Sequence, residues 1–339
     1  METILLLVAA EEDGGLGKPA LEAATAAREL AARLEGAKLL AGIFGAQAGR
    51  AGAALAGAGF GEALLVEHES LARARFATDA AACQALVAAS GASLVLAPAT
   101  SRLQRVLAAV SARCRGAVDT HATALGAESG AVHATRWFYR QRMVGRVSRE
   151  RRPWFLSLEP GVFAPHAASG DLVSRPVPAP LPESRTRVEG LRSPSSGAQT
   201  IRPDAPLLFV AGAGWCKKQA DGLAHVSEAE RLILGFLGKS GASLGGSKSV
   251  VDQKGEGGAL SFLTHLNQVG QTGSTPRHAK GLATCCHGEE PHTVGWRFVS
   301  GRRAVNLDAN CGWAQGKADV LYVADAFKVM ARVNELLAG

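Results

Sequence analysis

The sequence is poor in aromatic residues and has no long apolar run. Phe, Trp and Tyr make up 5% of its 339 residues, so a core must be built mainly from Ala, Val and Leu. The apolar run near the start, in METILLLVAA, is too short to span a membrane. It also lacks the basic residues that open a secretory signal. We therefore expect no membrane span and interpret this run as a first buried strand.

Cysteine is scarce as well. Six cysteines in a chain of this length do not form the disulfide framework of a secreted domain. The net charge of +7 is modest. It suits an acidic partner or an anionic ligand, but it is not by itself a signature of nucleic-acid binding. We expect a soluble protein in a reducing cytoplasm.

The length is too great for one ordinary hydrophobic core and favours two domains. In the first half, short apolar runs alternate with Ala-rich helical stretches, which predicts an α/β domain with a parallel sheet covered on both faces. The expected strands are residues 4–8, 39–44, 63–66 and 94–97, and the expected helices are residues 21–34, 77–89 and 103–114.

After Gly116 the pattern changes. Residues 131–138, 143–147 and 154–158 have strand-like sequences with no helix between them. We expect them to add an antiparallel extension to the first sheet.

A Pro-, Ser- and Arg-rich stretch then separates the two halves. We expect a first domain over residues 1–168, a linker over residues 169–205 with one short strand at residues 186–190, and a second α/β domain over residues 206–339. The second domain begins with the strand-like PLLFVAGAG. The predicted fold class is therefore α/β in two domains.

Seven arginines, interleaved with aromatic residues, lie between Arg136 and Arg152. Nucleic-acid binding is the specific interpretation of such a run. A solvated face or a protein interface is the ordinary one, and we favour it because the run falls on expected strands with no recognised nucleic-acid module around it. We expect no nucleic acid as a partner.

Three glycine-containing stretches in the second half could approach a ligand. VAGAGW, residues 210–215, follows a strand but lacks the third glycine of a dinucleotide fingerprint. SLGGSK, residues 243–248, ends in a corner with a lysine that would suit a phosphate or an electron-rich ring edge. QVGQTG, residues 268–273, has glycines that open the backbone, so Thr272 could offer its hydroxyl and N–H to one acceptor. An ordinary turn remains the alternative for each.

The stretch CCHGEEPH, residues 285–292, places two thiols and two imidazoles close together. Its spacing fits no standard zinc or iron–sulfur pattern. We expect no metal, because small thiols often serve as buried packing residues. A metal or iron–sulfur subunit stays open as an alternative, with a candidate ligand set of Cys216, Cys285, Cys286, His287 and Cys311.

Taken in order, these pieces resemble the alpha subunit of electron-transfer flavoproteins. The chain has VAGAG, GGSKSVVD, QVGQTG, CCHGEEPH, VNLD and ADVLYVAD in the order of that family's motifs. In the first half, VLAPATSRLQRVLAAVSARCRGAVDT and FLSLEPGVFAPHAASG resemble the family's corresponding segments. The resemblance covers nearly the whole chain, with VGQTG as its most specific piece, and indicates a divergent bacterial member.

The resemblance implies that the second domain binds FAD. Thr272 would hydrogen-bond flavin N5, with Gln271 against the ring beside it. His292 would lie near the flavin O2 edge, where negative charge builds up on reduction. Main-chain N–H groups around Gly288 would face the diphosphate. The residues that the resemblance assigns to the cofactor are Ser247, Lys248, Gln271, Thr272, Gly273, Gly288, His292, Asn306 and Asp319, the last two for the ribose and adenosine part.

Some positions depart from the family pattern. Lys248 stands where the family has arginine, which keeps the charge but loses the planar fork. Glu289 and Glu290 would complement a helix dipole but repel a nearby diphosphate. The resemblance therefore implies a flavin site with altered properties.

The function implied is that of an electron carrier that needs no catalytic acid, base or nucleophile. It would pair with a beta-type subunit and pass single electrons from a flavin-linked dehydrogenase to an acceptor. The divergence favours a dedicated donor, such as a demethylase or dehydrogenase of amines. The alternative from another class is a structural subunit of a larger dehydrogenase complex with a degenerate flavin site.

Overall fold

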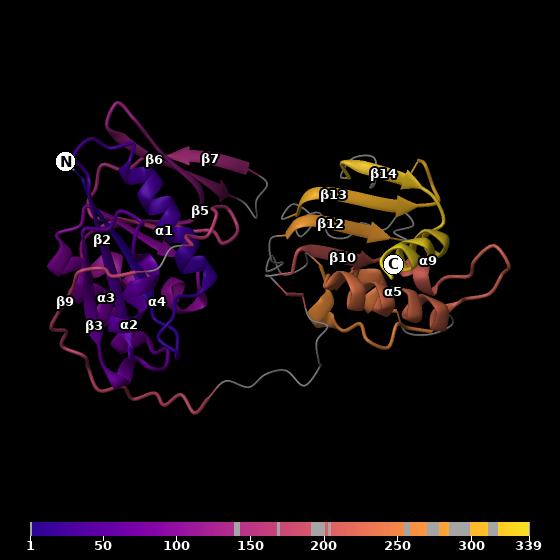
Figure 1. The fold of residues 1–339 in the computed structure, drawn as a ribbon, viewed down its shortest axis with the longest axis horizontal. Helices are drawn as coiled ribbons and strands as arrows, with labels where there is room; N and C mark the ends of the chain where they lie inside the picture. The colour runs from indigo at the N-terminus through magenta and orange to yellow at the C-terminus, as the bar shows by residue number, and fades with distance from the viewer. Residues whose placement is uncertain are drawn as a thin grey trace. The chain divides into compact units, whose positions relative to one another are not determined.

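The computed structural model divides into two compact units, Met1–Leu191 and Arg192–Gly339 (Figure 1). The predicted linker spans this division, and its boundaries stay a prediction. The structure describes residues 2–138, 143–167, 170–190, 201–202, 205–253, 258–269, 278–284, 299–310 and 318–338.

The first unit contains a nine-stranded sheet in the order β7-β6-β5-β8-β4-β1-β2-β3-β9. Its central strands are parallel, and helices cross over between them, so the predicted α/β class is confirmed. The parallel strands are β1 (Thr3–Ala9), β2 (Lys38–Gly45), β3 (Glu62–Glu67), β4 (Leu94–Pro98) and β8 (Trp154–Leu158), and the helices are α1 (Lys18–Ala31), α2 (Ala48–Ala51), α3 (Phe76–Ser90) and α4 (Ser101–Arg113).

Strand β1 lies in the middle of this sheet and is buried on both faces. Ile4 and Leu6 belong to the core layer that contains α1. Leu5 and Leu7 point the other way, into the layer under α3 and α4. The continuous apolar run ILLLV is thus the pattern of a doubly covered parallel strand, as the sequence indicated.

The antiparallel extension consists of β5 (Ala117–Glu128), β6 (Ala131–Phe138) and β7 (Met143–Val147). The prediction was wrong for Trp154–Leu158, which it placed in this extension. That strand, β8, inserts between β4 and β5 and is parallel to both. Every residue of its WFLSL sequence is buried, and only a central position covers such a strand on both faces.

A short strand, β9 (Ser174–Pro176), follows and pairs in parallel with β3. The strand expected at residues 186–190 was wrong, since those residues are described and form none. Strand β9 escaped prediction because three exposed residues ending in proline carry no periodic pattern. The chain beyond it stays beside the first unit, where the Val177 N–H donates to the Leu65 carbonyl at 2.7 Å.

Much of the arginine run is paired inside the first unit. The buried carboxylate of Asp119 accepts from Arg136 Nη1 at 2.9 Å, from Arg149 Nε at 2.8 Å and from Trp154 Nε1 at 3.0 Å. Arg152 binds Glu2 with an Nη2–Oε1 distance of 2.7 Å. These arginines hold the antiparallel extension against β8 and the N-terminal strand.

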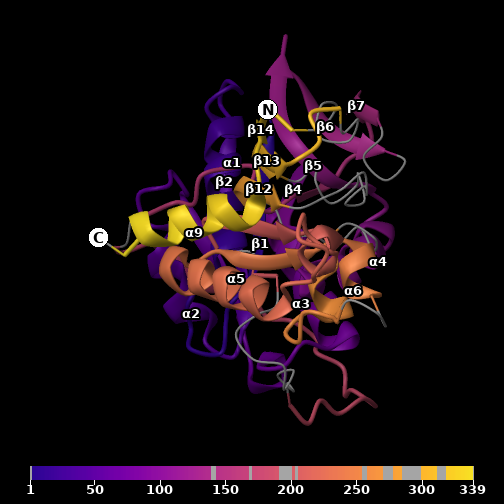
Figure 2. The same ribbon diagram turned by 90° about the vertical axis from the view of Figure 1, so that its right-hand side faces the viewer.

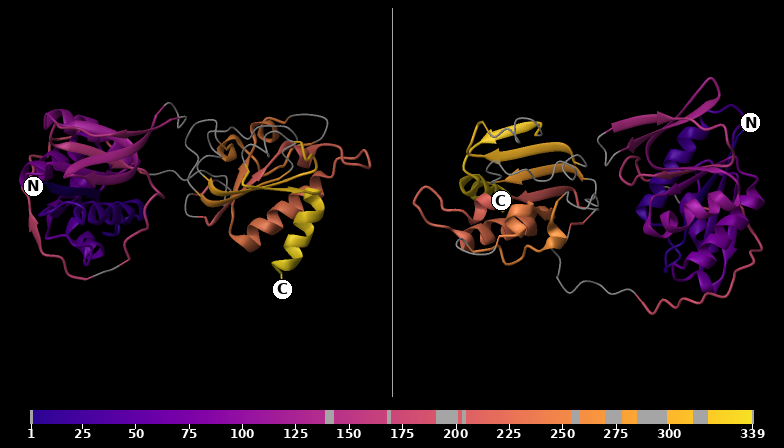
Figure 3. Two further views of the ribbon diagram at one scale, coloured as in Figure 1. Left: turned by 90° about the horizontal axis from the view of Figure 1, so that it is seen from above. Right: turned by 180° about the vertical axis from the view of Figure 1, so that it is seen from behind.

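The second unit has a five-stranded sheet in the order β11-β10-β12-β13-β14, with every neighbouring pair parallel. Helices α5 and α9 lie side by side on one of its faces (Figures 2 and 3). The elements are β10 (Leu207–Ala211), α5 (Val226–Ser240), β11 (Ser243–Gly246), α6 (Lys248–Val251), β12 (His278–Thr284), β13 (Val299–Asn306), β14 (Val320–Val323) and α9 (Ala326–Leu336).

Replacing Asp119 with Asn should destabilise the first unit by about 2–4 kcal/mol, because it removes the charge that satisfies two guanidinium groups and a buried indole. Urea denaturation with hydrogen exchange measured in β5 and β8 checks this. The exposed pair of Arg146 and Glu128 supplies the control: Glu128→Gln should cause little change. Equal losses in both variants would contradict the role given to Asp119.

The same substitution should change the pH dependence of stability. Burial alone would raise the pKa of Asp119, but the hydrogen bonds from Arg149, Arg136 and Trp154 outweigh it and lower that pKa. Because the folded pKa lies below the unfolded one, the carboxylate stabilises the fold at neutral pH, and this contribution falls away below about pH 4. The wild-type stability should therefore fall more steeply in acid than that of Asp119→Asn.

Candidate functional site

The strand order of the second unit reverses between β10 and β12. Strand β10 comes first in the chain, β11 adds to one side of it, and β12, β13 and β14 add in turn to the other. In open parallel sheets, a crevice forms at the carboxyl ends of the strands where the order reverses, and ligands bind there. The described residues at this edge form the candidate site.

Ser247 and Lys248 follow the carboxyl end of β11. Ser247 is fully buried: its N–H donates to the Ala211 carbonyl at 2.9 Å, and its Oγ accepts from the Val250 N–H at 3.2 Å. Lys248 is half-exposed, and its Nζ donates to Asp252 Oδ2 at 2.6 Å. The serine is fixed by backbone bonds, whereas the lysine is held by an exposed carboxylate.

The glycine corner of SLGGSK is required by close packing. A Cβ on Gly245 would lie 2.4 Å from Val269 Cγ2, well inside contact distance. Val269 is fully buried, and its N–H donates to the Gly246 carbonyl at 3.0 Å. The residue that directly precedes residues 270–273 is therefore held at the carboxyl end of β11.

A buried tryptophan joins the two strand ends at the reversal point. Trp215 Nε1 donates to the Thr284 hydroxyl at 2.9 Å, and that hydroxyl lies 3.3 Å from the Val210 carbonyl, to which it donates. The Trp215 ring packs on Phe327 of α9 with a centroid distance of 4.6 Å. Thr284 directly precedes the CCHGEEPH segment, so the described chain reaches this segment at the carboxyl end of β12.

Asn306 ends β13 and is buried, and its Oδ1 accepts from the Asp308 N–H at 3.0 Å. The Ala324 N–H donates to the Asn306 carbonyl at 3.1 Å, which places the end of β14 and the neighbouring Asp325 beside it. Asp325 follows β14 and caps α9, with its Oδ1 accepting from the Phe327 N–H at 2.9 Å. The sequence analysis did not select Asp325. The signal for it was an aspartate between a strand and a helix, which is a typical N-cap position.

Asp319 lies elsewhere. It precedes β14 and pairs with Arg302, whose N–H donates to Oδ2 at 2.7 Å and whose Nη2 donates to Oδ1 at 2.9 Å. These bonds lower the pKa of Asp319. Arg302 is four residues upstream of Asn306 on β13, or about 13 Å along the strand. The structure does not bring Asp319 together with Ser247 and Asn306.

The remaining predicted residues, Gln271, Thr272, Gly273, Gly288 and His292, lie outside the described residues. So do four of the five candidate metal ligands: Cys285, Cys286, His287 and Cys311. The fifth, Cys216, is buried, and burial raises the pKa of its thiol. Within the described parts of the chain, no three His, Cys, Asp or Glu side chains form a group that could hold a metal ion.

The first sheet has a reversal point of its own, between β1 and β4. A hollow of about 480 Å³ lies at their carboxyl ends. Two of its arginines are already paired: Arg73 with Glu12, and Arg102 with Asp79 through an Nη2–Oδ1 contact of 2.8 Å. Internal ion pairs therefore neutralise much of the positive charge at this edge.

Comparison with models of protein families gives one match. A model of the electron transfer flavoprotein domain matches residues 4–185, just over half of the chain. A search of the curated proteins found no match. Among the described residues, no helix is both long and apolar enough to cross a membrane.

The bond between Trp215 and Thr284 can be tested. Thr284→Val should destabilise the second unit by about 1–3 kcal/mol, because it leaves the buried indole N–H without its acceptor. Thr284→Ser keeps the hydroxyl and should lose less. Hydrogen exchange of β10 and β12, followed by mass spectrometry, reports on this unit alone. Equal protection in both variants would show that the bond does not hold the strand ends.

Proposed function

The chain belongs to the electron transfer flavoprotein family, and we propose that it is an alpha-type subunit that binds FAD at the carboxyl edge of its second unit. The observation that carries this proposal is the grouping at that edge. Buried Ser247 and Asn306 end or follow two strands there. Val269 hydrogen-bonds to the last residue of β11, and Thr284 is the last residue of β12. These two residues directly precede the two segments expected to meet the flavin.

The side chains at this edge suit a dinucleotide. A hydroxyl, an amide and a lysine provide hydrogen bonds and one positive charge, which match ribose hydroxyls, the diphosphate and the polar edge of a flavin ring. FAD, when bound, supplies the one-electron chemistry. In this proposal, Ser247 and Lys248 bind beside the ring and Asn306 binds the ribose. Thr272, Gln271, Gly273, Gly288 and His292 complete the site as the family resemblance implies.

The proposed partners are a beta-type subunit and a donor dehydrogenase. An electron carrier has to meet both its donor and its acceptor, and a cofactor at an open sheet edge suits such contacts. A dedicated donor that acts on methylated amines remains our proposal, based on the divergence of the flavin motifs. The proposed location is the cytoplasm.

The proposal predicts a yellow complex. The chain, purified with a beta-type subunit, should show the two visible absorption bands of flavin, and mass spectrometry of the released ligand should identify FAD. Asn306→Ala should weaken FAD retention about tenfold, because it removes a buried polar group from the edge. Arg332→Gln, an exposed change on α9, is the control and should retain FAD fully.

The outcomes separate this proposal from its alternatives. A colourless complex that releases no flavin would contradict the electron carrier and favour a structural subunit. Release of another nucleotide would favour a structural subunit that kept only a nucleotide site. Iron or zinc in elemental analysis, in proportion to protein, would favour the metal subunit.

Substitutions of two aspartates test which residues bind the ribose of FAD. We expect Asp325→Asn to lower FAD retention and Asp319→Asn to leave it unchanged, because Asp325 lies beside Asn306 at the carboxyl edge, whereas Asp319 precedes β14 and pairs with Arg302. Asparagine also caps helices, so α9 should remain intact in the first variant. Loss of FAD in Asp319→Asn alone would instead support the role that the family resemblance gives to Asp319.

A further inference from the structure

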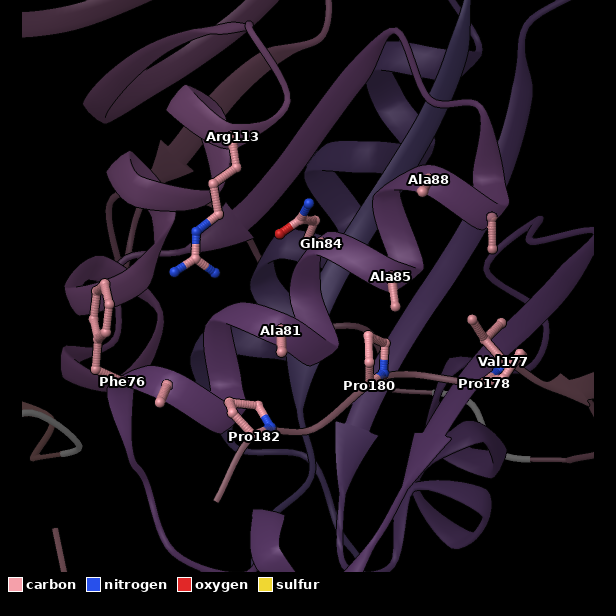
Figure 4. Close-up of a pocket in the computed structure, with 12 residues that line it drawn as sticks. Phe76, Ala81, Gln84, Ala85, Ala88, Arg113, Val177, Pro178, Pro180 and Pro182 are labelled. Atoms are coloured by element: carbon pink, nitrogen blue, oxygen red, sulfur yellow. The ribbon is translucent and has the colours of Figure 1, made fainter. Parts of the chain in front are cut away.

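A groove of about 760 Å³ runs over the outer face of α3 in the first unit. Figure 4 shows Arg113 and Phe76 toward one end of it and Val177 and Pro178 toward the other. The prolines come from the segment after β9, which forms one wall. The volume lies within the range of small-molecule sites.

The floor of the groove is apolar, although a surface helix usually presents polar residues there. Ala77, Ala81, Ala85 and Ala88 line it, and their spacing puts them on one face of α3. The opposite face of the helix is buried in the core through residues such as Leu86. Helix α3 is therefore apolar on both faces, and one of them borders a groove.

One charged side chain stands at an end of this groove. Among the described residues that line it, Arg113 alone is charged, and Gln84 is the only polar neutral side chain. The Arg113 guanidinium lies 6.0 Å from the centre of the Phe76 ring. None of the described carboxylates forms a salt bridge with Arg113, in contrast to Arg136, Arg149 and Arg152.

The residues that line the groove indicate which kind of ligand it could bind. An extended peptide would bring an N–H and a C=O at every residue to a surface that offers two polar side chains, so the groove could recognise few of them. An unbranched alkyl chain needs no hydrogen bonds and fits within the volume.

We propose that this groove binds an amphiphile with an unbranched apolar chain and a carboxylate head. The chain lies along the alanines of α3 and against the proline wall. The carboxylate pairs with the Arg113 guanidinium, and the Gln84 amide donates to it as well. This site is separate from the proposed flavin edge, and its occupancy does not depend on flavin.

Isothermal titration calorimetry of the full chain with decanoate tests the proposal. We expect a saturable isotherm with one site, and binding at least about tenfold weaker for decyltrimethylammonium, which has the same chain and the opposite charge. Heats that do not saturate, or equal affinity for both probes, would overturn the proposal and indicate unspecific contact with an apolar surface.

Variants test the two halves of the groove. Arg113→Gln should weaken decanoate binding by at least about threefold, and Arg113→Lys should restore most of it, since an exposed charge pair contributes modestly. Ala88→Glu puts a carboxylate on the exposed floor and should abolish binding. Arg105→Gln, on the same helix as Arg113 but outside the groove, is the matched control and should bind as the wild type does.

Thermal unfolding of each variant shows whether it is folded. All four changes are at the surface or at a partly exposed floor, so we expect unchanged midpoints. Wild-type affinity in both a folded Arg113→Gln and a folded Ala88→Glu would overturn the assignment of this groove.

Discussion

Parallel pairing is the constraint on which both units depend. Strands that run in one direction must be joined by crossovers, so all their carboxyl ends meet at one edge of the sheet. In the second unit this geometry gathers residues that are far apart in the sequence. Ser247, Thr284 and Asn306 each end or follow a different strand, yet they share one edge. Asp319 fails to join them because it precedes its strand.

Charge satisfaction organises the first unit in a comparable way. A buried carboxylate is costly unless hydrogen bonds and opposite charges compensate for its desolvation. Asp119 receives such bonds from two arginines and a tryptophan on three different strands or their ends. Arg136, Arg149 and Arg152, among the described arginines of the run, are therefore engaged within the unit and stabilise its fold.

The parts of the fold that the sequence predicted well are the ones with strong periodicity. The runs at residues 4–8, 39–44 and 94–97 coincide with β1, β2 and β4 to within one residue at each end. Strand β5, with twelve residues, was not expected, because its pattern is broken at His121, where φ is +59° and the register with β8 shifts. A bulge interrupts the alternation of buried and exposed side chains on which strand prediction relies.

In the candidate site, too, features that depend on nearby sequence could be predicted, whereas features that depend on the direction of a strand could not. Serine and asparagine at strand ends could be identified from the order of motifs, because each lies beside its own strand in the sequence. The order of motifs could not show which of the two aspartates, Asp319 or Asp325, lies at the carboxyl edge. Both lie in ADVLYVAD, six residues apart, and only the direction of β14 decides which one faces the carboxyl edge.

The sheet also determines which positions at this edge are fixed. Ser247 and Asn306 are fixed by their own backbone contacts at strand ends, so their positions depend little on the loops around them. Gly245 is fixed as well, because any larger residue would collide with Val269. The backbone contacts of the strand ends therefore keep these positions in place whatever sequence follows them, which is how a fold can retain one edge while the neighbouring residues change.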